Sequence, residues 1–244
     1  MPRLEDLAFR CVRAATRSRL LARALFGVDF RPLQEDETYF DVTTPVLVRR
    51  AARRLSPSSK VLDLGTGTTA VVGLALWRKI GCEVTSADVN PASVQLAQAN
   101  VERNRAPIRV LQSSFFDGVD GAFDTVVFNP PYVPTEAGRR RGLSPRLRRQ
   151  WDGGPDGLAV IDGFLAALEG DPRAPVALMG VNHRHTPRER VSALLAGHAG
   201  IEVEDVYRHP LLPVDVYVLR RRPPLPGAVR AAARVRMGAP ALTA

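Results

Sequence analysis

The sequence is poor in cysteine, lysine and aromatic side chains, and these shortages exclude several classes of protein. Its two cysteines, Cys11 and Cys82, can form neither a disulfide framework nor a metal site, so we expect no bound metal. No run of residues is long and apolar enough to span a bilayer, and the first residues, MPRLEDLAFR, lack the apolar stretch of a secretory signal. We therefore expect a cytoplasmic protein that makes no contact with membranes.

The 244 residues carry a net charge of +9, and the positive charge is almost entirely arginine because Lys60 and Lys79 are the only lysines. Such an excess favours anionic partners, although a bias toward arginine produces part of it without any partner. Binding of RNA or DNA through residues 139–149 is one alternative. This segment holds six arginines with no acidic residue among them, namely Arg139, Arg140, Arg141, Arg146, Arg148 and Arg149.

A four-residue motif, Asn129-Pro130-Pro131-Tyr132, follows the apolar run FDTVVF at residues 123–128. Short runs rich in β-branched and aromatic residues are typical of strands buried on both faces of a parallel sheet. Two consecutive prolines cannot continue a sheet, because they lack N–H donors and have a fixed φ. Asn129 is therefore expected at the carboxyl end of a strand, which is the edge where open parallel sheets bind ligands.

This motif suits the methylation of a planar NH2 group, whose delocalised lone pair makes it a poor nucleophile. The nitrogen reacts better when two acceptors hold its N–H bonds and aim the lone pair at an electrophilic methyl group. We expect the Asn129 side-chain oxygen and the Pro130 carbonyl to be these acceptors. Pro131 should stiffen the turn, and the Tyr132 ring should offer a face on which the flat acceptor stacks. A proline-rich turn without chemistry is the alternative interpretation.

A glycine-rich turn, GTGTTA, follows the predicted strand KVLDL at residues 60–64 and fits the dinucleotide pattern G-x-G-x-x-G/A. Two carboxylates favour a different ligand. Asp63 precedes the first glycine by two residues, where it would crowd a pyrophosphate but accept from an ammonium group. Asp88 ends the next strand, 88 − 63 = 25 residues later, where it can accept both hydroxyls of a ribose. A cofactor with an adenosine, an amino-acid end and no phosphate is S-adenosylmethionine.

Further cofactor contacts are expected from the glycine-rich turn, which lets a ligand approach the backbone, and from the ends of the neighbouring strands. Ser114 is placed to bond the adenine amino group and Phe115 to line the adenine ring, with ordinary loop packing as the alternative for both. The complete set of expected cofactor contacts is Asp63, Gly65, Thr66, Gly67, Asp88, Val89, Ser114, Phe115 and Asn129.

Hydrophobic periodicity predicts alternating strands and helices through most of the chain. Strands are expected at residues 60–64, 82–88, 107–112, 123–128, 174–181, 201–207 and 214–220. Helices are expected within 4–26, at 44–55, from the glycine-rich turn to 79, and at 91–103, 158–168 and 188–198. Thr44 is expected to cap the helix at 44–55, with Pro45 at its first position. Residues 28–41 should form a loop over the cofactor or a short strand pair, and 133–155 a long connection without regular structure.

Four segments together resemble the HemK/PrmC-type protein-glutamine N-methyltransferases: DLGTG at residues 63–67, ADVNP at 87–91, FNPPYVP at 128–134 and GGPDGLAVIDGFL at 153–165. The resemblance implies an α/β, Rossmann-like class I methyltransferase fold, with a seven-stranded, mostly parallel sheet and an antiparallel terminal hairpin. It also implies S-adenosylmethionine as cofactor and a protein glutamine as acceptor, for which a translation factor is one candidate. Thr69 and Ser114 depart from the family pattern, where a glycine and an aspartate are usual.

The expected organisation has three parts: a helical extension and loop at residues 1–40, the methyltransferase domain at 41–221, and a flexible tail rich in arginine, proline and alanine at 222–244. The asparagine motif is shared with methyltransferases that modify amino groups of nucleic acids. An adenine amino group is therefore an alternative acceptor, and a small molecule is a further one. A degenerate domain that only binds a partner is a third hypothesis.

Overall fold

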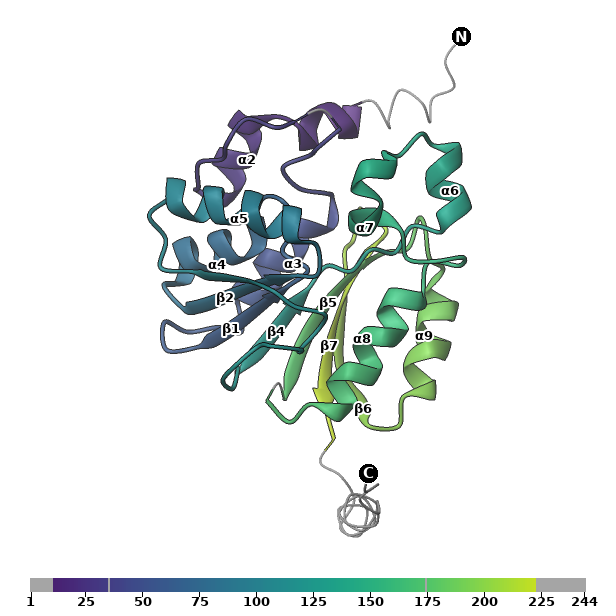
Figure 1. Ribbon diagram of the computed structural model, residues 1–244. Helices are drawn as coiled ribbons and strands as arrows, with labels where there is room; N and C mark the ends of the chain where they lie inside the picture. The colour runs from purple at the N-terminus through teal and green to yellow at the C-terminus, as the bar shows by residue number, and fades with distance from the viewer. Residues whose placement is uncertain (1–10, 35, 174, 223–244) are drawn as a thin grey trace, which may run out of the picture.

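The computed structural model describes residues 11–34, 36–173 and 175–222. Its strands form one seven-stranded sheet, and Figure 1 shows helices on both faces of this sheet. The sheet order is β3-β2-β1-β4-β5-β7-β6, and all strands run in the same direction except β7, which is antiparallel to both β5 and β6. The expected fold class is thereby confirmed. The strands are β1 (Lys60–Leu64), β2 (Glu83–Asp88), β3 (Arg109–Gln112), β4 (Thr125–Phe128), β5 (Val176–Asn182), β6 (Ile201–Arg208) and β7 (Val214–Arg221).

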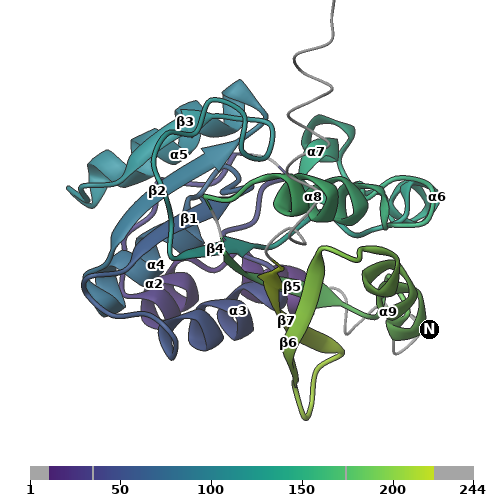
Figure 2. The same ribbon diagram turned by 90° about the horizontal axis from the view of Figure 1, so that it is seen from below.

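The helices form two layers, and Figure 2 shows α8 and α9 on the side of the sheet away from α2, α3 and α4. Among the described helices, none combines the length and apolarity that a membrane span needs. Residues 11–16 are helical as well. The helices are α2 (Arg19–Phe26), α3 (Thr43–Ala52), α4 (Val71–Ile80), α5 (Pro91–Arg103), α6 (Thr135–Arg140), α7 (Arg148–Trp151), α8 (Ala159–Gly170) and α9 (Arg188–Gly197), with a 3-10 turn at Pro145–Leu147.

Successive residues of the central strands point to opposite faces of the sheet, so each strand contributes to two cores. Val61 and Val127 pack with α2 to α5, whereas Leu62 and Phe128 pack with α8 and α9. All four residues of β4 are buried, as expected for a strand covered on both faces. The short apolar run before the asparagine motif is thus fixed from both sides.

The segment between α2 and α3 belongs to the same core as the helices that follow it. Phe26 and Phe40 are buried and meet edge-on with ring centroids 5.3 Å apart, and the Phe30 and Tyr39 rings lie at the same distance. The segment contains no strand among its described residues, so the strand-pair alternative for residues 28–41 is wrong, and the position of this loop over the cofactor stays a prediction. The predicted helical positions before residue 11 and the tail after residue 222 lie outside the described part of the chain.

The predicted start of α3 is wrong in its details. The helix begins at Thr43, and Val42 is its N-cap residue without a side-chain bond. The carboxylate of Asp41 instead accepts from the backbone N–H groups of Thr43 at 3.1 Å and Thr44 at 2.9 Å. The Thr44 hydroxyl also donates to Asp41, at 2.8 Å, and Pro45 occupies the third helical position. The carboxylate of Asp41, three residues before Thr44, therefore does the capping that we expected from Thr44.

The connection at residues 133–155 is not irregular, contrary to the prediction, because it contains α6, the 3-10 turn and α7. Its anchor is Trp151, whose Nε1 donates to the Ser144 carbonyl at 2.9 Å. The ring packs so closely on Gly138 that a Cβ there would overlap it. Local helices form because one aromatic side chain gives this surface segment a small core of its own, which no hydrophobic period in the sequence reveals.

Candidate active site

The carboxyl ends of β1, β2 and β4 meet at the upper edge of the sheet in Figure 1. Leu64 is paired with Ala87 on one side and with Phe128 on the other. The residues that follow these three positions are the glycine-rich turn, Asp88 and Asn129. The sheet topology therefore brings both sequence motifs to one edge, as expected for an open parallel sheet.

Asp63 stabilises the glycine-rich turn through three hydrogen bonds. It is 2% exposed, and its Oδ2 accepts from the Thr66 hydroxyl at 2.5 Å, the Gly73 N–H at 2.9 Å and the Ser86 hydroxyl at 3.2 Å. Burial raises the pKa of Asp63 to about 6, and the three donors oppose that rise. The side chains of Asp63 and Thr66 thus stabilise the turn itself. Their direct contact with a cofactor stays a prediction.

Asp88 and Gly67 form the part of the edge that suits a ribose. Asp88 is 8% exposed, and its two oxygens accept from the Gly67 and Asn90 N–H groups, each at 2.9 Å. A carboxylate offers about four lone-pair positions, so it can still accept from two hydroxyls. Gly67 has a φ of +63°, and a Cβ there would meet no atom within 4 Å. At Gly65, by contrast, a Cβ would lie 2.9 Å from the Phe128 ring.

Val89, Ser114 and Phe115 border the same edge and fit the expected adenine side. Val89 is 45% exposed, which is unusual for a valine at the end of a buried strand, and Ser114 is exposed. Phe115 has a φ of +49°, uncommon for a bulky residue, and its ring lies edge-on to Phe128 with centroids 6.5 Å apart. Together they supply an apolar surface for a flat base, and their contact with the cofactor remains a prediction.

Thr69, one of the two departures from the family pattern, ties the glycine-rich turn to the segment before α3. Its hydroxyl donates to the Tyr39 carbonyl at 3.2 Å. Asn100 of α5 joins the same two segments, since it donates to the Thr68 carbonyl at 3.2 Å and accepts from the Arg31 N–H at 2.8 Å. The turn, α5 and the segment before α3 are therefore one hydrogen-bonded unit, and a glycine at position 69 would remove one of its bonds.

The side chain of Asn129 is bonded at one end only. Its Nδ2 donates to Asp41 Oδ1 at 3.1 Å, whereas its Oδ1 is buried and accepts from no residue that the structure describes. Because a carboxylate only accepts, Asp41 holds the NH2 end and leaves the oxygen as an unfilled acceptor. The Pro130 carbonyl likewise accepts from none of the described residues. The two acceptors expected from the sequence are thus both without a donor from the described part of the chain.

Asp41 is the residue at this site that sequence reasoning missed. Besides bonding Asn129 it accepts from the Tyr132 hydroxyl at 2.5 Å, and that hydroxyl also lies 2.7 Å from the Thr43 hydroxyl. Its partners stand 88 and 91 residues away in the sequence, so no local pattern connects them. An acidic residue just before a Thr-Thr-Pro helix start was the available signal.

Tyr132 does not offer the open ring face that we expected. The residue is 6% exposed, and its ring lies at 24° to the His185 ring with centroids 6.1 Å apart. Burial and the carboxylate of Asp41 raise the pKa of Tyr132 well above its ordinary value. A buried phenol needs a hydrogen-bond partner, and here that partner is Asp41. Tyr132 therefore fixes Asp41, and an acceptor would have to stack elsewhere.

The glycine-rich run at residues 153–157 packs on the backbone of the asparagine motif. A Cβ on Gly153 would lie 2.8 Å from the Pro131 carbonyl oxygen, and one on Gly157 would lie 2.5 Å from that of Tyr132. The Thr186 hydroxyl donates to the same Tyr132 carbonyl at 2.8 Å. These glycines are needed for close approach, so the run shapes the turn that presents Asn129.

Two of the arginines between residues 139 and 149 form ion pairs with neighbouring acids. Arg139 lies 2.8 Å from Glu136, and Arg148 lies 2.5 Å from Asp152. Both acids stand just outside the stretch that the sequence showed to be free of acidic residues. The positive charge of the segment is therefore partly neutralised within the protein.

Other arginines of the segment turn toward the site. Arg146 donates to the Gln34 side chain at 3.0 Å, which links the segment to the loop before α3. Burial raises the pKa of Asp88, and the nearby charge of Arg149 opposes that rise. Arg146 therefore joins the segment to the loop before α3, and Arg149 lies near Asp88, whereas Arg139 and Arg140 are exposed.

A further arginine contacts the histidine that stacks on Tyr132. Arg141 lies 2.9 Å from His185 Nδ1. Burial, Arg141 and Arg184 lower the pKa of His185 to about 4, so its ring is neutral at pH 7. The stacked partner of Tyr132 is thus an uncharged ring flanked by two guanidinium groups.

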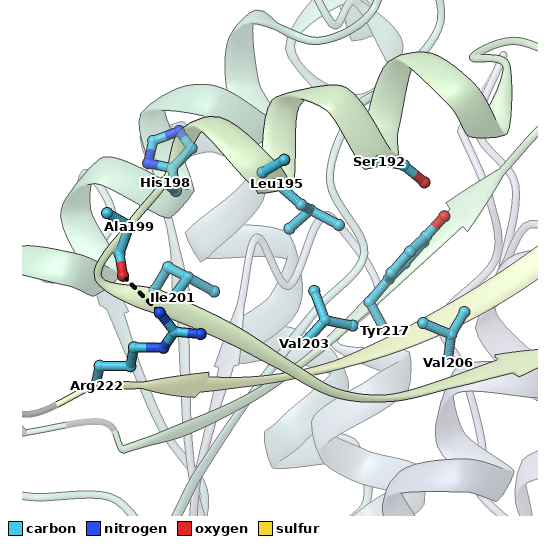
Figure 3. Close-up of a pocket in the computed structure, with 10 residues that line it drawn as sticks. Ser192, Leu195, His198, Ala199, Ile201, Val203, Val206, Tyr217 and Arg222 are labelled. Atoms are coloured by element: carbon cyan, nitrogen blue, oxygen red, sulfur yellow. Dashed lines mark hydrogen bonds between the residues drawn. The ribbon is translucent and has the colours of Figure 1, made fainter.

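The hollows of the described surface include one beside α7 and one beside α9. One of about 380 Å³ lies between α7 and the start of α8, and Arg149 lines it. The other, of about 340 Å³, lies between α9 and β6 and is shown in Figure 3, where Leu195 and Val203 point toward Tyr217. Neither hollow is lined by the predicted site residues, so the strand ends and not a pocket define the candidate active site.

The residues at the upper edge fit S-adenosylmethionine. Gly67 leaves open space beside its backbone, Asp88 retains acceptor positions for ribose hydroxyls, and Val89 offers apolar surface. The unfilled acceptor of Asn129 belongs to the neighbouring strand end, where a second substrate would meet the cofactor.

Comparison with known proteins agrees with this arrangement. Residues 37–141 match the family described as methyltransferase small domain. A release factor glutamine methyltransferase of Agrobacterium fabrum is 31% identical over 174 residues, which make up 68% of this chain and 58% of the relative. The chain spans about half the length of the curated relatives that it matches, between 42% and 58% for the first three.

Solved structures share the fold. A methyltransferase from Pyrococcus furiosus has a TM-score of 0.62 and 20% identity, over 88% of this chain and 98% of that one. The E. cuniculi Mtq2–Trm112 complex, described as responsible for methylation of the eRF1 translation termination factor, has a TM-score of 0.50 and 25% identity. That alignment covers 80% of this chain and 99% of the other.

Proposed function

We propose that the chain is a HemK/PrmC-type methyltransferase, which uses S-adenosylmethionine to methylate the side-chain amide nitrogen of a glutamine in a protein. The observation that carries the proposal is the buried oxygen of Asn129, which has no donor among the described residues. A primary amide has two N–H groups, which can donate to the Asn129 oxygen and to the Pro130 carbonyl. A methyl acceptor without an NH2 group would leave the buried Asn129 oxygen without a hydrogen-bond donor, which costs a free energy of about 1–3 kcal/mol.

The cofactor supplies an electrophilic methyl group on a sulfonium sulfur. The amide nitrogen forms the new N–C bond as the C–S bond breaks, and the sulfur keeps the electron pair. The nitrogen then releases one proton to solvent, so no strong base is required. Asn129 and Pro130 contribute by holding the amide so that its lone pair faces the methyl group.

The proposed protein substrate belongs to the translation termination machinery. The names of the Agrobacterium fabrum relative and of the Mtq2–Trm112 complex support this, since the first refers to release factors and the second to eRF1. The cytoplasmic location expected from the sequence is part of the same proposal.

Transfer of labelled methyl from S-adenosylmethionine into a host lysate tests the proposal. We expect label that survives nuclease treatment, disappears with protease, and maps to a glutamine by peptide analysis. Asn129→Ala serves as the matched control and should incorporate little label. Label that disappears with nuclease would contradict the proposal and favour a nucleic-acid amino group. Label confined to small molecules would contradict it as well.

A further inference from the structure

The carboxylate of Asp41 is built into the start of α3 and into the acceptor site at once. Its Oδ1 accepts from the Thr43 N–H, the Thr44 N–H and the Thr44 hydroxyl at 2.8–3.1 Å. The same oxygen accepts from Asn129, and Oδ2 accepts from Tyr132. Three donors from one helix end therefore set where the carboxylate lies, and the carboxylate sets where two side chains of the motif lie.

The orientation of the Asn129 amide follows from this contact. Rotating the amide by half a turn would place its oxygen against a carboxylate oxygen, where two acceptors repel. The carboxylate therefore selects the orientation in which the Asn129 oxygen faces the acceptor. This selection depends on Asp41, because the Asn129 oxygen has no donor among the described residues that would hold the amide from its other end.

The Asp41 carboxylate also makes the Asn129 oxygen a stronger hydrogen-bond acceptor. Hydrogen bonds to a charged group are about twice as strong as neutral ones, and bonds in a chain polarise one another. An amide that donates to a carboxylate carries more negative charge on its oxygen. Methyl transfer moves positive charge from the sulfonium sulfur to the acceptor nitrogen, so a more negative oxygen beside that nitrogen favours the transition state.

We propose that Asp41 is a positioning residue for methyl transfer, which fixes the orientation of the Asn129 amide and strengthens its oxygen as an acceptor. The proposal rests on the proposed function, in which Asn129 accepts from the substrate amide. It also makes the loop before α3 part of the acceptor site, because Asp41 is the last residue of that loop.

The test compares Asp41→Asn with Arg49→Gly in the full chain. Asp41→Asn keeps the shape and an oxygen for the helix start but removes the charge. We expect turnover in protein methylation to fall roughly tenfold to a hundredfold, with S-adenosylmethionine affinity within about twofold of wild type. Arg49→Gly weakens the same helix through its helix propensity at an exposed position and leaves every donor to Asp41 in place. It should lower Tm by roughly 2–4 °C and leave turnover within about twofold.

A second readout does not depend on the acceptor. The side-chain NH2 signals of Asn129, assigned in a 15N–1H NMR spectrum through the Asn129→Ala spectrum, should shift in Asp41→Asn and stay in place in Arg49→Gly. Unchanged signals, or turnover of Asp41→Asn within about twofold of wild type, would overturn the proposal. If the wild-type protein methylates no protein at all, the proposed function fails, and the NMR comparison alone decides whether Asp41 orients Asn129.

Discussion

The candidate site has two halves, a cofactor half around Asp63 and Asp88 and an acceptor half around Asn129 and Asp41, and they are built in different ways. On the cofactor side the defining hydrogen bonds join residues close in sequence, 3 residues apart for Thr66 and Asp63 and 21 apart for Gly67 and Asp88. On the acceptor side the bonds of Asn129 and Tyr132 to Asp41 join residues 88 and 91 apart. The cofactor half is a folded unit of neighbouring strands, whereas the acceptor half exists only where the loop before α3 meets the end of β4.

The halves also differ in how completely their polar groups are satisfied. Asp63 and Asp88 already accept from the backbone or side chains of their own turn. Asn129 keeps one buried oxygen without a donor among the described residues. We therefore expect changes near Asp88 to affect mainly the binding of the cofactor, and changes at Asn129 to affect mainly turnover. Measurements on single variants test this separation.

The largest effect is expected from Asn129→Ala. Removing the positioning acceptor should reduce turnover roughly tenfold to a thousandfold, because the amide is then held by one acceptor instead of two. Affinity for S-adenosylmethionine, measured by calorimetry, should stay within about twofold. Asn104→Ala is a matched control on the far end of α5, and it should not slow methyl transfer. Unchanged turnover in Asn129→Ala would show that the acceptor half lies elsewhere.

Asp63→Asn tests the cofactor half through its pH dependence. Burial raises the pKa of Asp63 from 3.8 to about 6, so the folded state binds this proton more tightly than the unfolded chain does. The resulting stabilisation is complete below pH 3.8 and is lost as the pH rises to about 6. Over this range the free energy of unfolding of the wild type should fall by about 3 kcal/mol relative to the variant, measured by urea titration. A difference that does not change with pH would mean that folding leaves the pKa of Asp63 at its unfolded value.

Asp88→Ala should weaken the binding of S-adenosylmethionine by roughly tenfold to a hundredfold, since bonds to a charged acceptor contribute about 1.5–3 kcal/mol. Turnover at saturating cofactor should change much less than in Asn129→Ala. Asp117→Ala, which alters an exposed acid after β3, is the control and should bind the cofactor like the wild type. Equal affinity in Asp88→Ala would require a different pose of the adenosine.

The smallest effect is expected from Arg140→Gln, which removes an exposed charge from the segment at residues 139–149. Methylation of a protein glutamine should change by less than about twofold, because exposed single charges contribute little. If the acceptor were a nucleic acid, the same change would weaken binding and reduce its salt dependence by about one phosphate contact. Titrating binding against salt concentration separates the two outcomes.

Local patterns in the sequence predicted the fold, and they placed the candidate cofactor residues on one edge, because those features depend on adjacent residues. The strand that carries Asp63, the glycine turn and the helix after Asn90 are each contained in a short stretch, and the Asn90 side chain accepts from the Ala92 N–H. The sequence also located Asn129. It could not reveal Asp41 or the covered face of Tyr132, since both depend on segments that meet only after folding. The helices of residues 135–151 were missed because a single tryptophan organises them.

Because β7 runs antiparallel to β5, residue 222 and Asn129 lie at opposite edges of the sheet. Arg220 pairs with Val176 at the beginning of β5, so β7 ends at the lower edge of the sheet in Figure 1, opposite Asn129. Arg222 is exposed there. A fluorophore or a surface linker attached at position 222 would stand apart from the acceptor edge. Binding of a large protein substrate could then be followed on an immobilised enzyme whose working face remains accessible.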